Sequence, residues 1–352
     1  MTHPEVFFLV KNEKWRQKAM PGAFEIVMEE RKALVDKIIE MMRQGYFFNR
    51  EEWDREALRP QNPLSKVQYK GGNRMRLMAT VVEKGYRDPR WATARQYAQK
   101  GYYIKKGEHG IICEKWIFEK QKRTQDENGN SRLETVELEH PQVSYFRVFN
   151  AEQVQDFPEF PTGEYTEPEM DRLIDQIIST SECPIHELAQ DRSFYSPATD
   201  EIILPLRSEF KDQTSFAKTL LHEMSHSTGA ASRLNRSFGG PFGSKGYAKE
   251  ELRAEIGALF TEADLGIHLS GEHYEDHSDY LKSWISVLSG DYNEFFRACA
   301  DAEKISERLV GNYSKKYELP MPEMKEISDR QEAKISDRTV DDESIRQKGA
   351  CL

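Results

Sequence analysis

The chain has 352 residues, of which 38% are hydrophobic, and this is enough for two or three domains with proper cores. Its net charge of −10 would argue against a nucleic-acid partner if the charge were spread evenly. Four cysteines without a CxxC pair indicate free thiols rather than a disulfide framework. No segment approaches the roughly 18 apolar residues of a membrane span, so we expect a soluble, cytoplasmic protein without a membrane partner.

The first half of the chain mixes helical and strand-like patterns. Apolar residues recur at helical spacing from Phe24 onward, whereas aromatic residues and Gly71-Gly72 further along are typical of turns and short strands. The predicted elements are helices at 24–44 and 93–100, strands at 111–118 and 143–150, and a polar hairpin loop at 126–130. We therefore expect an N-terminal extension over 1–23 and an α+β domain over 24–160.

The second half is predominantly helical after a proline-rich linker at 161–168. An extended stretch at 192–204, with a turn at 198–200, predicts a pair of strands. Helices are predicted at 170–180, 215–227, 247–265, 280–288 and 292–309. The expectation is a mainly helical domain with a small sheet over 169–316, followed by a charged, mobile tail over 317–352.

The string His222-Glu223-Met224-Ser225-His226 is an HExxH motif inside one of these helices. Histidines at i and i+4 leave the same face of a helix and can bind one metal ion, with the glutamate beside it. On its own, however, the motif could belong to an ordinary solvated helix face. The interpretation as a metal site therefore depends on a third ligand, because a catalytic zinc usually has three protein ligands and one open position.

The third ligand is predicted in the next helix. A metzincin would carry histidine at position 232, but Ser232 stands there, and a hydroxyl is a poor zinc ligand at neutral pH. Glu251 and Glu255 instead share one helix face, so one can bind Zn²⁺ while the other accepts the N–H of a ligating histidine. We take Glu251 as the ligand and Glu255 as its support, with the reverse assignment left open.

Such a site is suited to hydrolysis of peptide bonds. Zinc lowers the pKa of a bound water toward ~7, and Glu223 can take that proton and later pass it to the leaving amine. The extended stretch at 192–204 would then offer an edge strand to the backbone of a protein substrate.

The distribution of charge points to a second function. Residues 66–123 hold 15 Lys or Arg and five Asp or Glu, a balance of +10, so the rest of the chain carries about −20. Aromatic residues lie among these cations: Tyr69, Tyr86, Trp91, Tyr97, Tyr102, Tyr103 and Trp116. Cations for phosphates and flat rings for bases are the mixture that single-stranded nucleic acid sites use, although such rings can also be core and such lysines a solvated face.

Within this region the turn Lys105-Lys106-Gly107 is the best candidate for a phosphate contact. Arg74, Arg76 and Arg95 come next.

Several motifs in register resemble the ArdC-like antirestriction proteins of plasmids and other mobile elements, over roughly residues 30–310. The motifs of the first half are Tyr69-Lys70-Gly71-Gly72-Asn73, Trp91 to Gln96, Ile104 to Gly110 and Arg147 to Gln153. Those of the second half are Ile203-Leu204-Pro205, Leu220 to Gly229, Arg233 to Arg236 and Tyr247 to Glu255. Lys70, Asn73 and Trp91 lie in these motifs and complete the set of candidate DNA-binding residues.

The resemblance implies a domain that binds single-stranded DNA, joined to a zincin-like metallopeptidase domain and acting when DNA enters a recipient cell by conjugation. It also implies that the antirestriction effect need not depend on proteolysis. The expected function is a zinc metallopeptidase-like antirestriction protein with Glu223 as general base. Two alternatives stay open: a non-proteolytic protein that shields incoming DNA, with the zinc structural or vestigial, and a protease with no DNA role.

Overall fold

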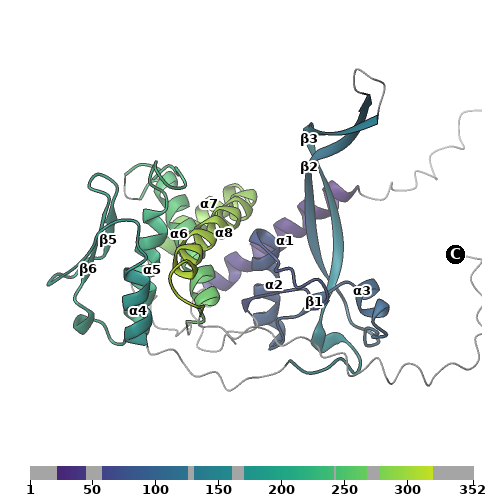
Figure 1. Cartoon of the computed structure of the whole chain (residues 1–352), viewed down its shortest axis with the longest axis horizontal. Coiled ribbons are helices and arrows are strands. Elements are labelled where there is room, and N and C mark those ends of the chain that lie inside the picture. The colour runs from purple at the N-terminus through teal and green to yellow at the C-terminus, as the bar shows by residue number, and fades with distance from the viewer. Residues whose placement is uncertain are drawn as a thin grey trace, which may run out of the picture.

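The structure is a computed structural model that describes residues 22–44, 58–125, 131–160, 170–241, 243–267 and 278–319 (Figure 1). Most of the predicted extension at 1–23, the linker at 161–168 and almost all of the predicted tail lie outside these ranges. Among the described helices, none combines the length and apolar character needed to cross a membrane.

The first half combines helices with a long antiparallel ribbon. Its elements are α1 (Ala23–Arg43), α2 (Gly71–Lys84), β1 (Trp91–Ala92), α3 (Ala94–Gln99), β2 (Ile111–Gln125) and β3 (Ser131–Asn150). The strands form a sheet in the order β1-β3-β2, with all neighbours antiparallel. Both ribbon strands are longer than predicted, and their outer half extends beyond the packed body of the protein (Figure 1).

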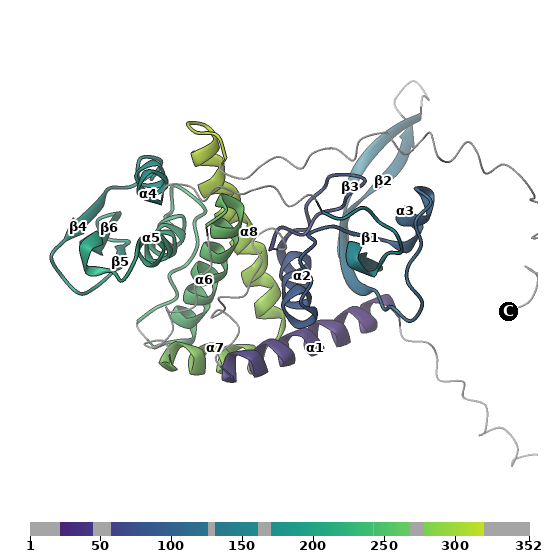
Figure 2. The same ribbon diagram turned by 90° about the horizontal axis from the view of Figure 1, so that it is seen from below.

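The second half places a small sheet at the far end of a group of helices (Figure 2). Its elements are α4 (Met170–Ile178), β4 (Ile185–Leu188), β5 (Phe194–Ser196), β6 (Glu201–Pro205), α5 (Gln213–Ser227), α6 (Lys245–Leu265), α7 (Ser278–Gly290) and α8 (Asn293–Ser314). β5 and β6 form the predicted antiparallel pair, and β4, which was not predicted, adds in parallel to β6. The sheet order is β4-β6-β5. The α+β fold class is confirmed.

Helix α2 replaces the turns and strands predicted around Gly71-Gly72. Gly71 has φ +54°, which an L side chain rarely adopts, and its N–H donates to Glu303 of α8 at 2.8 Å. A Cβ on Gly72 would lie 2.4 Å from the ring of Phe296. The two glycines are therefore a helix start that packs closely against α8, and reading them as a turn was wrong.

One hydrophobic core joins the two halves. Helix α1 lies along the base of the molecule, from α7 to the ribbon (Figure 2). Its buried face is apolar because Val35, Ile38 and Met42 recur at helical spacing, and it packs in one cluster with Met75 of α2 and Phe260 of α6. A second cluster lies between α4, the small sheet, α5 and α8. The proposed boundary at 161–168 is thus bridged by a continuous core.

Candidate metal centre and nucleic-acid surface

Helix α5 positions the two histidines of the motif. The helix begins at Asp212, whose side chain accepts a hydrogen bond from the backbone N–H of Ser215 at 2.7 Å. The buried side chains of Phe216, Leu220 and Met224 hold one face of the helix in the core. His222 and His226 lie one turn apart, and their Nε2 atoms are 3.1 Å apart.

Helix α6 brings the carboxylate of Glu251 to both imidazoles. Its Oε2 lies 3.5 Å from Nε2 of His222, and its Oε1 lies 3.4 Å from Nε2 of His226. Ligand bonds of about 2.0–2.2 Å in a tetrahedral zinc site would separate neighbouring ligand atoms by roughly 3.3–3.6 Å. These three side chains form the group of possible metal ligands found in the described part of the chain, with ligand atoms within 4.8 Å of one another.

Each histidine has a carboxylate at its other ring nitrogen. Nδ1 of His222 lies 3.1 Å from Glu255, and Nδ1 of His226 lies 3.4 Å from Glu250. Since an ionised carboxylate only accepts, each Nδ1 carries the hydrogen, and Nε2 is the atom that can bind a metal. Glu255 thus lies at the position of a side chain that orients a metal-binding histidine. Glu250 has the same relation to His226, which the sequence did not suggest.

The electrostatics of the cluster favour positive charge. Burial lowers the pKa of both histidines, but hydrogen bonds to the surrounding glutamates outweigh it: the pKa of His222 is raised well above its usual value, and that of His226 is raised to about 9. Burial raises the pKa of Glu251, yet hydrogen bonds to both histidines lower it overall. A divalent cation would supply the positive charge that this environment stabilises.

Glu223 lies next to these groups and contacts β5 of the small sheet through the backbone of Tyr195. Its side chain is buried, and burial raises its pKa, with the nearby histidines and a backbone hydrogen bond from Tyr195 acting against that shift. Tyr195 belongs to β5, an edge strand among the described residues. The candidate base is therefore held between α5 and a strand edge.

The candidate DNA-binding residues divide into two groups. Arg95, Lys105 and Lys106 are exposed, and Lys105 donates to the backbone oxygen of Glu152 at 2.7 Å. Lys70 is also exposed but pairs with Glu307 of α8.

The other four candidates hold the fold together. Arg74 binds Asp264 and the carbonyl of Phe260, Arg76 is buried against α1, and the Trp91 ring is fully buried. The amide of Asn73 exchanges hydrogen bonds with the backbone of Glu114. Because these side chains are committed to internal contacts, we no longer propose them as DNA contacts.

Comparisons with known proteins agree with this arrangement. Residues 28–149 match the family model described as the N-terminal domain of anti-restriction factor ArdC, and residues 172–301 match the zincin-like metallopeptidase model. The crystal structure of metal-free antirestriction ArdC protein from the R388 plasmid is 28% identical, with a TM-score of 0.65 over 82% of this chain and 99% of that one. The chain is an ArdC-like protein. The Mn(II)-bound structure of the same plasmid protein matches this ArdC-like chain with a TM-score of 0.64.

Curated relatives share the same region. Two Escherichia coli proteins described as DNA primase TraC are 38% and 39% identical to this ArdC-like protein over 289 residues. That region is 79% of this chain but only 26% and 19% of those relatives. The uncharacterized protein y4eC of Sinorhizobium fredii is 29% identical over 80% of this chain and 91% of its own length.

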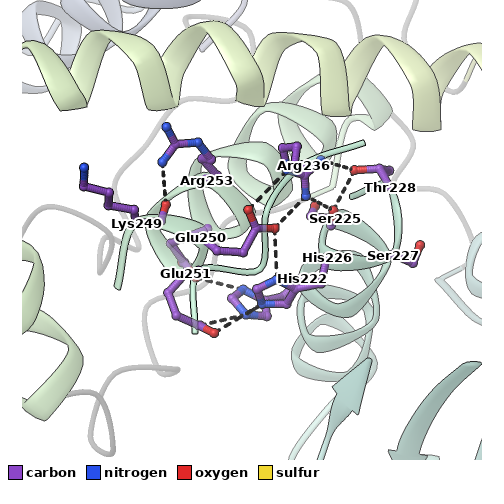
Figure 3. A network of polar contacts seen from close by, with 12 residues as sticks. His222, Ser225, His226, Ser227, Thr228, Arg236, Lys249, Glu250, Glu251 and Arg253 are labelled. Carbon is purple, nitrogen blue, oxygen red and sulfur yellow. Dashed lines mark hydrogen bonds and ion pairs between the residues drawn. The ribbon is translucent and has the colours of Figure 1, made fainter. Parts of the chain in front are cut away.

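Arg236 is a second residue of the ArdC-like site, besides Glu250, for which the sequence suggested no role. Its guanidinium donates to Glu250 at 2.7 Å, to the Thr228 hydroxyl at 2.7 Å and to the Ser225 carbonyl at 2.8 Å (Figure 3). It thereby fixes Glu250 to the C-terminal end of α5. The only signal in the sequence was its place in the Arg233 to Arg236 motif, to which no role was given.

Proposed function

We propose that this protein is an antirestriction protein that binds single-stranded DNA and is a zinc-dependent metallopeptidase. The observation that carries the peptidase is the convergence of three side chains: the Nε2 atoms of His222 and His226 lie 3.1 Å apart, and the two carboxylate oxygens of Glu251 lie 3.5 and 3.4 Å from them. Three converging ligands leave a tetrahedral ion one position for water or substrate. The likeness to the R388 plasmid protein supports the antirestriction role.

Different residues of the chain have different roles in the proposed hydrolysis of peptide bonds. A bound zinc ion would supply Lewis acidity and a water of lowered pKa. Glu223 takes a proton at its carboxylate and returns it to the leaving amine. Glu255 and Glu250 hold the imidazoles with Nε2 toward the centre. Strand β5, which is an edge strand among the described residues and contacts Glu223 through Tyr195, is the element that would pair with an extended substrate backbone.

The test of this chemistry is the paired behaviour of Glu223→Gln. The wild type should carry about one zinc per chain by elemental analysis, and the variant should keep that metal while losing cleavage of a protein substrate. Retained cleavage in the variant would remove Glu223 as the base. The same variant assayed for protection of incoming DNA from restriction separates a proteolytic role from simple shielding.

Shielding without proteolysis is the second candidate, supported by the exposed cations Arg95, Lys105 and Lys106. Reversing all three to glutamate should weaken binding of single-stranded DNA and lower the steepness of its salt dependence. Lys304→Glu on α8, which is also exposed but lies in the other half, is the control. Unchanged affinity in the triple variant would show that the DNA-binding surface lies elsewhere.

A further inference from the structure

One of the seven aromatic rings named above, Tyr103, is left in solvent. The seven rings that lie among the cations are all described by the structure. Six pack inside the protein: Tyr69, Tyr86 and Trp91 in one cluster, Tyr97 and Tyr102 in another, and Trp116 against Phe24 and Arg31. The seventh, Tyr103, is 66% exposed.

The backbone around Tyr103 explains why its ring points outward. Residues 102–105 are extended, and alternate side chains of an extended chain lie on opposite faces. Tyr102 and Ile104 pack against the buried cluster of Ala92, Tyr97 and Val154, so Tyr103 and Lys105 share the outer face. Two residues of extended chain span roughly 7 Å, so this is the separation between the points where the side chains of Tyr103 and Lys105 leave the backbone.

This segment is held firmly in place. Ile104 pairs with Val154 in an antiparallel bridge, the N–H of Lys105 donates to the carbonyl of Gln153, and the N–H of Gln155 donates to the carbonyl of Tyr103, both at 2.9 Å. A ring on an ordered backbone loses little conformational freedom when a ligand stacks on it.

The turn beside the ring carries two ammonium groups that can hold an anionic ligand. Lys105 and Lys106 are exposed on this turn. The neighbouring carboxylates of Glu108 and Glu152 are occupied, the first by the amide of Gln153 and the second by the backbone N–H groups of Arg87 and Asp88. A flat apolar face next to two cations matches one nucleotide of a single strand, with its base and its phosphate.

We propose that Tyr103 is a base-stacking site, with Lys105 and Lys106 holding the adjacent phosphates of single-stranded DNA. This site rests on the proposed DNA-binding function and specifies where a base is held. Stacking on the ring is sequence-tolerant because every base has an aromatic face, whereas the two lysines account for salt dependence.

The experiment measures binding of a labelled oligothymidylate by fluorescence anisotropy at several salt concentrations. Tyr103→Ala should weaken binding by about 5- to 100-fold without changing the salt slope, and Tyr103→Phe should bind like the wild type. Lys105→Gln should instead reduce the salt slope by about 0.7. On an abasic strand of equal length, Tyr103→Ala should bind as well as the wild type, because no base is there to stack.

Phe118→Ala is the matched control, since Phe118 is 60% exposed on the ribbon. The stacking site is overturned if Tyr103→Ala binds the oligonucleotide as tightly as the wild type. It is also overturned if Phe118→Ala loses as much affinity as Tyr103→Ala. A wild type that fails to bind the oligonucleotide at all overturns the proposed DNA-binding function itself. Thermal unfolding of each variant shows that it is folded.

Discussion

The carboxylate of Glu255 lies 3.1 Å from Nδ1 of His222, at the ring nitrogen that does not face Glu251. This contact assigns different roles to two glutamates that share one helix face. Glu251 reaches the Nε2 atoms of both histidines, whereas Glu255 reaches only the far nitrogen of one.

The two glutamates should therefore differ in metal binding. Glu251→Gln removes a ligand and should reduce bound zinc from about one per chain to a small fraction of that. Glu255→Gln should keep a site but weaken its affinity by about 10- to 100-fold, because His222 loses the partner that orients it. Competition with a chelator of known affinity measures both. Equal losses of zinc affinity would contradict the difference between the two glutamates, and the reverse order would exchange their roles. Glu187→Gln on β4, outside the cluster of ligands, is the control.

Arg236 should be needed for stability as well as for the site. Arg236→Ala leaves the buried carboxylate of Glu250 without its guanidinium partner, and removing one member of a buried ion pair costs about 3 kcal/mol or more. Chemical denaturation of the metal-free protein measures this loss. Arg43→Ala, which removes an exposed arginine paired with the equally exposed Glu40, should cost far less. Similar losses for the two variants would show that the Arg236 network is not a stabilising anchor.

The two halves of the chain should unfold together. The core cluster contains Ile38 of α1, Met75 of α2, Phe260 of α6 and Phe295 of α8, and the buried pair of Arg74 and Asp264 crosses the same interface. Calorimetry of the metal-free protein should show a single transition, moved to lower temperature in Arg74→Ala. Two separate transitions in the wild type would mean that the halves are independent domains.

The stability of the metal-free protein should depend on Glu262. Burial, and then repulsion from Glu255, raises the pKa of Glu262 to about 7 against the attraction of Lys218 and His222. Its folded pKa lies above its unfolded value, so the folded state binds more protons, and the contribution of this group falls as the pH rises from ~4.5 to ~7. The cost above pH ~7 is on the order of 3 kcal/mol.

Glu262→Gln removes that titration. The variant should have nearly the stability of the wild type at pH ~5 and a higher melting temperature at pH ~8. Melting curves of both proteins across this range, with a chelator present, make the comparison. A difference in melting temperature that is constant with pH would contradict the raised pKa.

Local patterns predicted much of the metal centre. His222 and His226 meet because four residues make one helical turn, and the same spacing relates Glu251 and Glu255 on α6. No pattern within one helix, however, could show that α6 crosses α5 with Glu250 at His226, or that Arg236 would lock that carboxylate.

The basic region shows the opposite case. Its composition marked a cluster of cations and rings, but Arg74 and Arg76 are buried because α2 packs against α6 and α1. The sequence by itself determined most of the helices, though not α2, together with the strand pair of β5 and β6 and the spacing of the ligands, because these depend on neighbours within a few residues. Only the tertiary structure decided which charged and aromatic side chains face water, because burial depends on segments far apart in the chain.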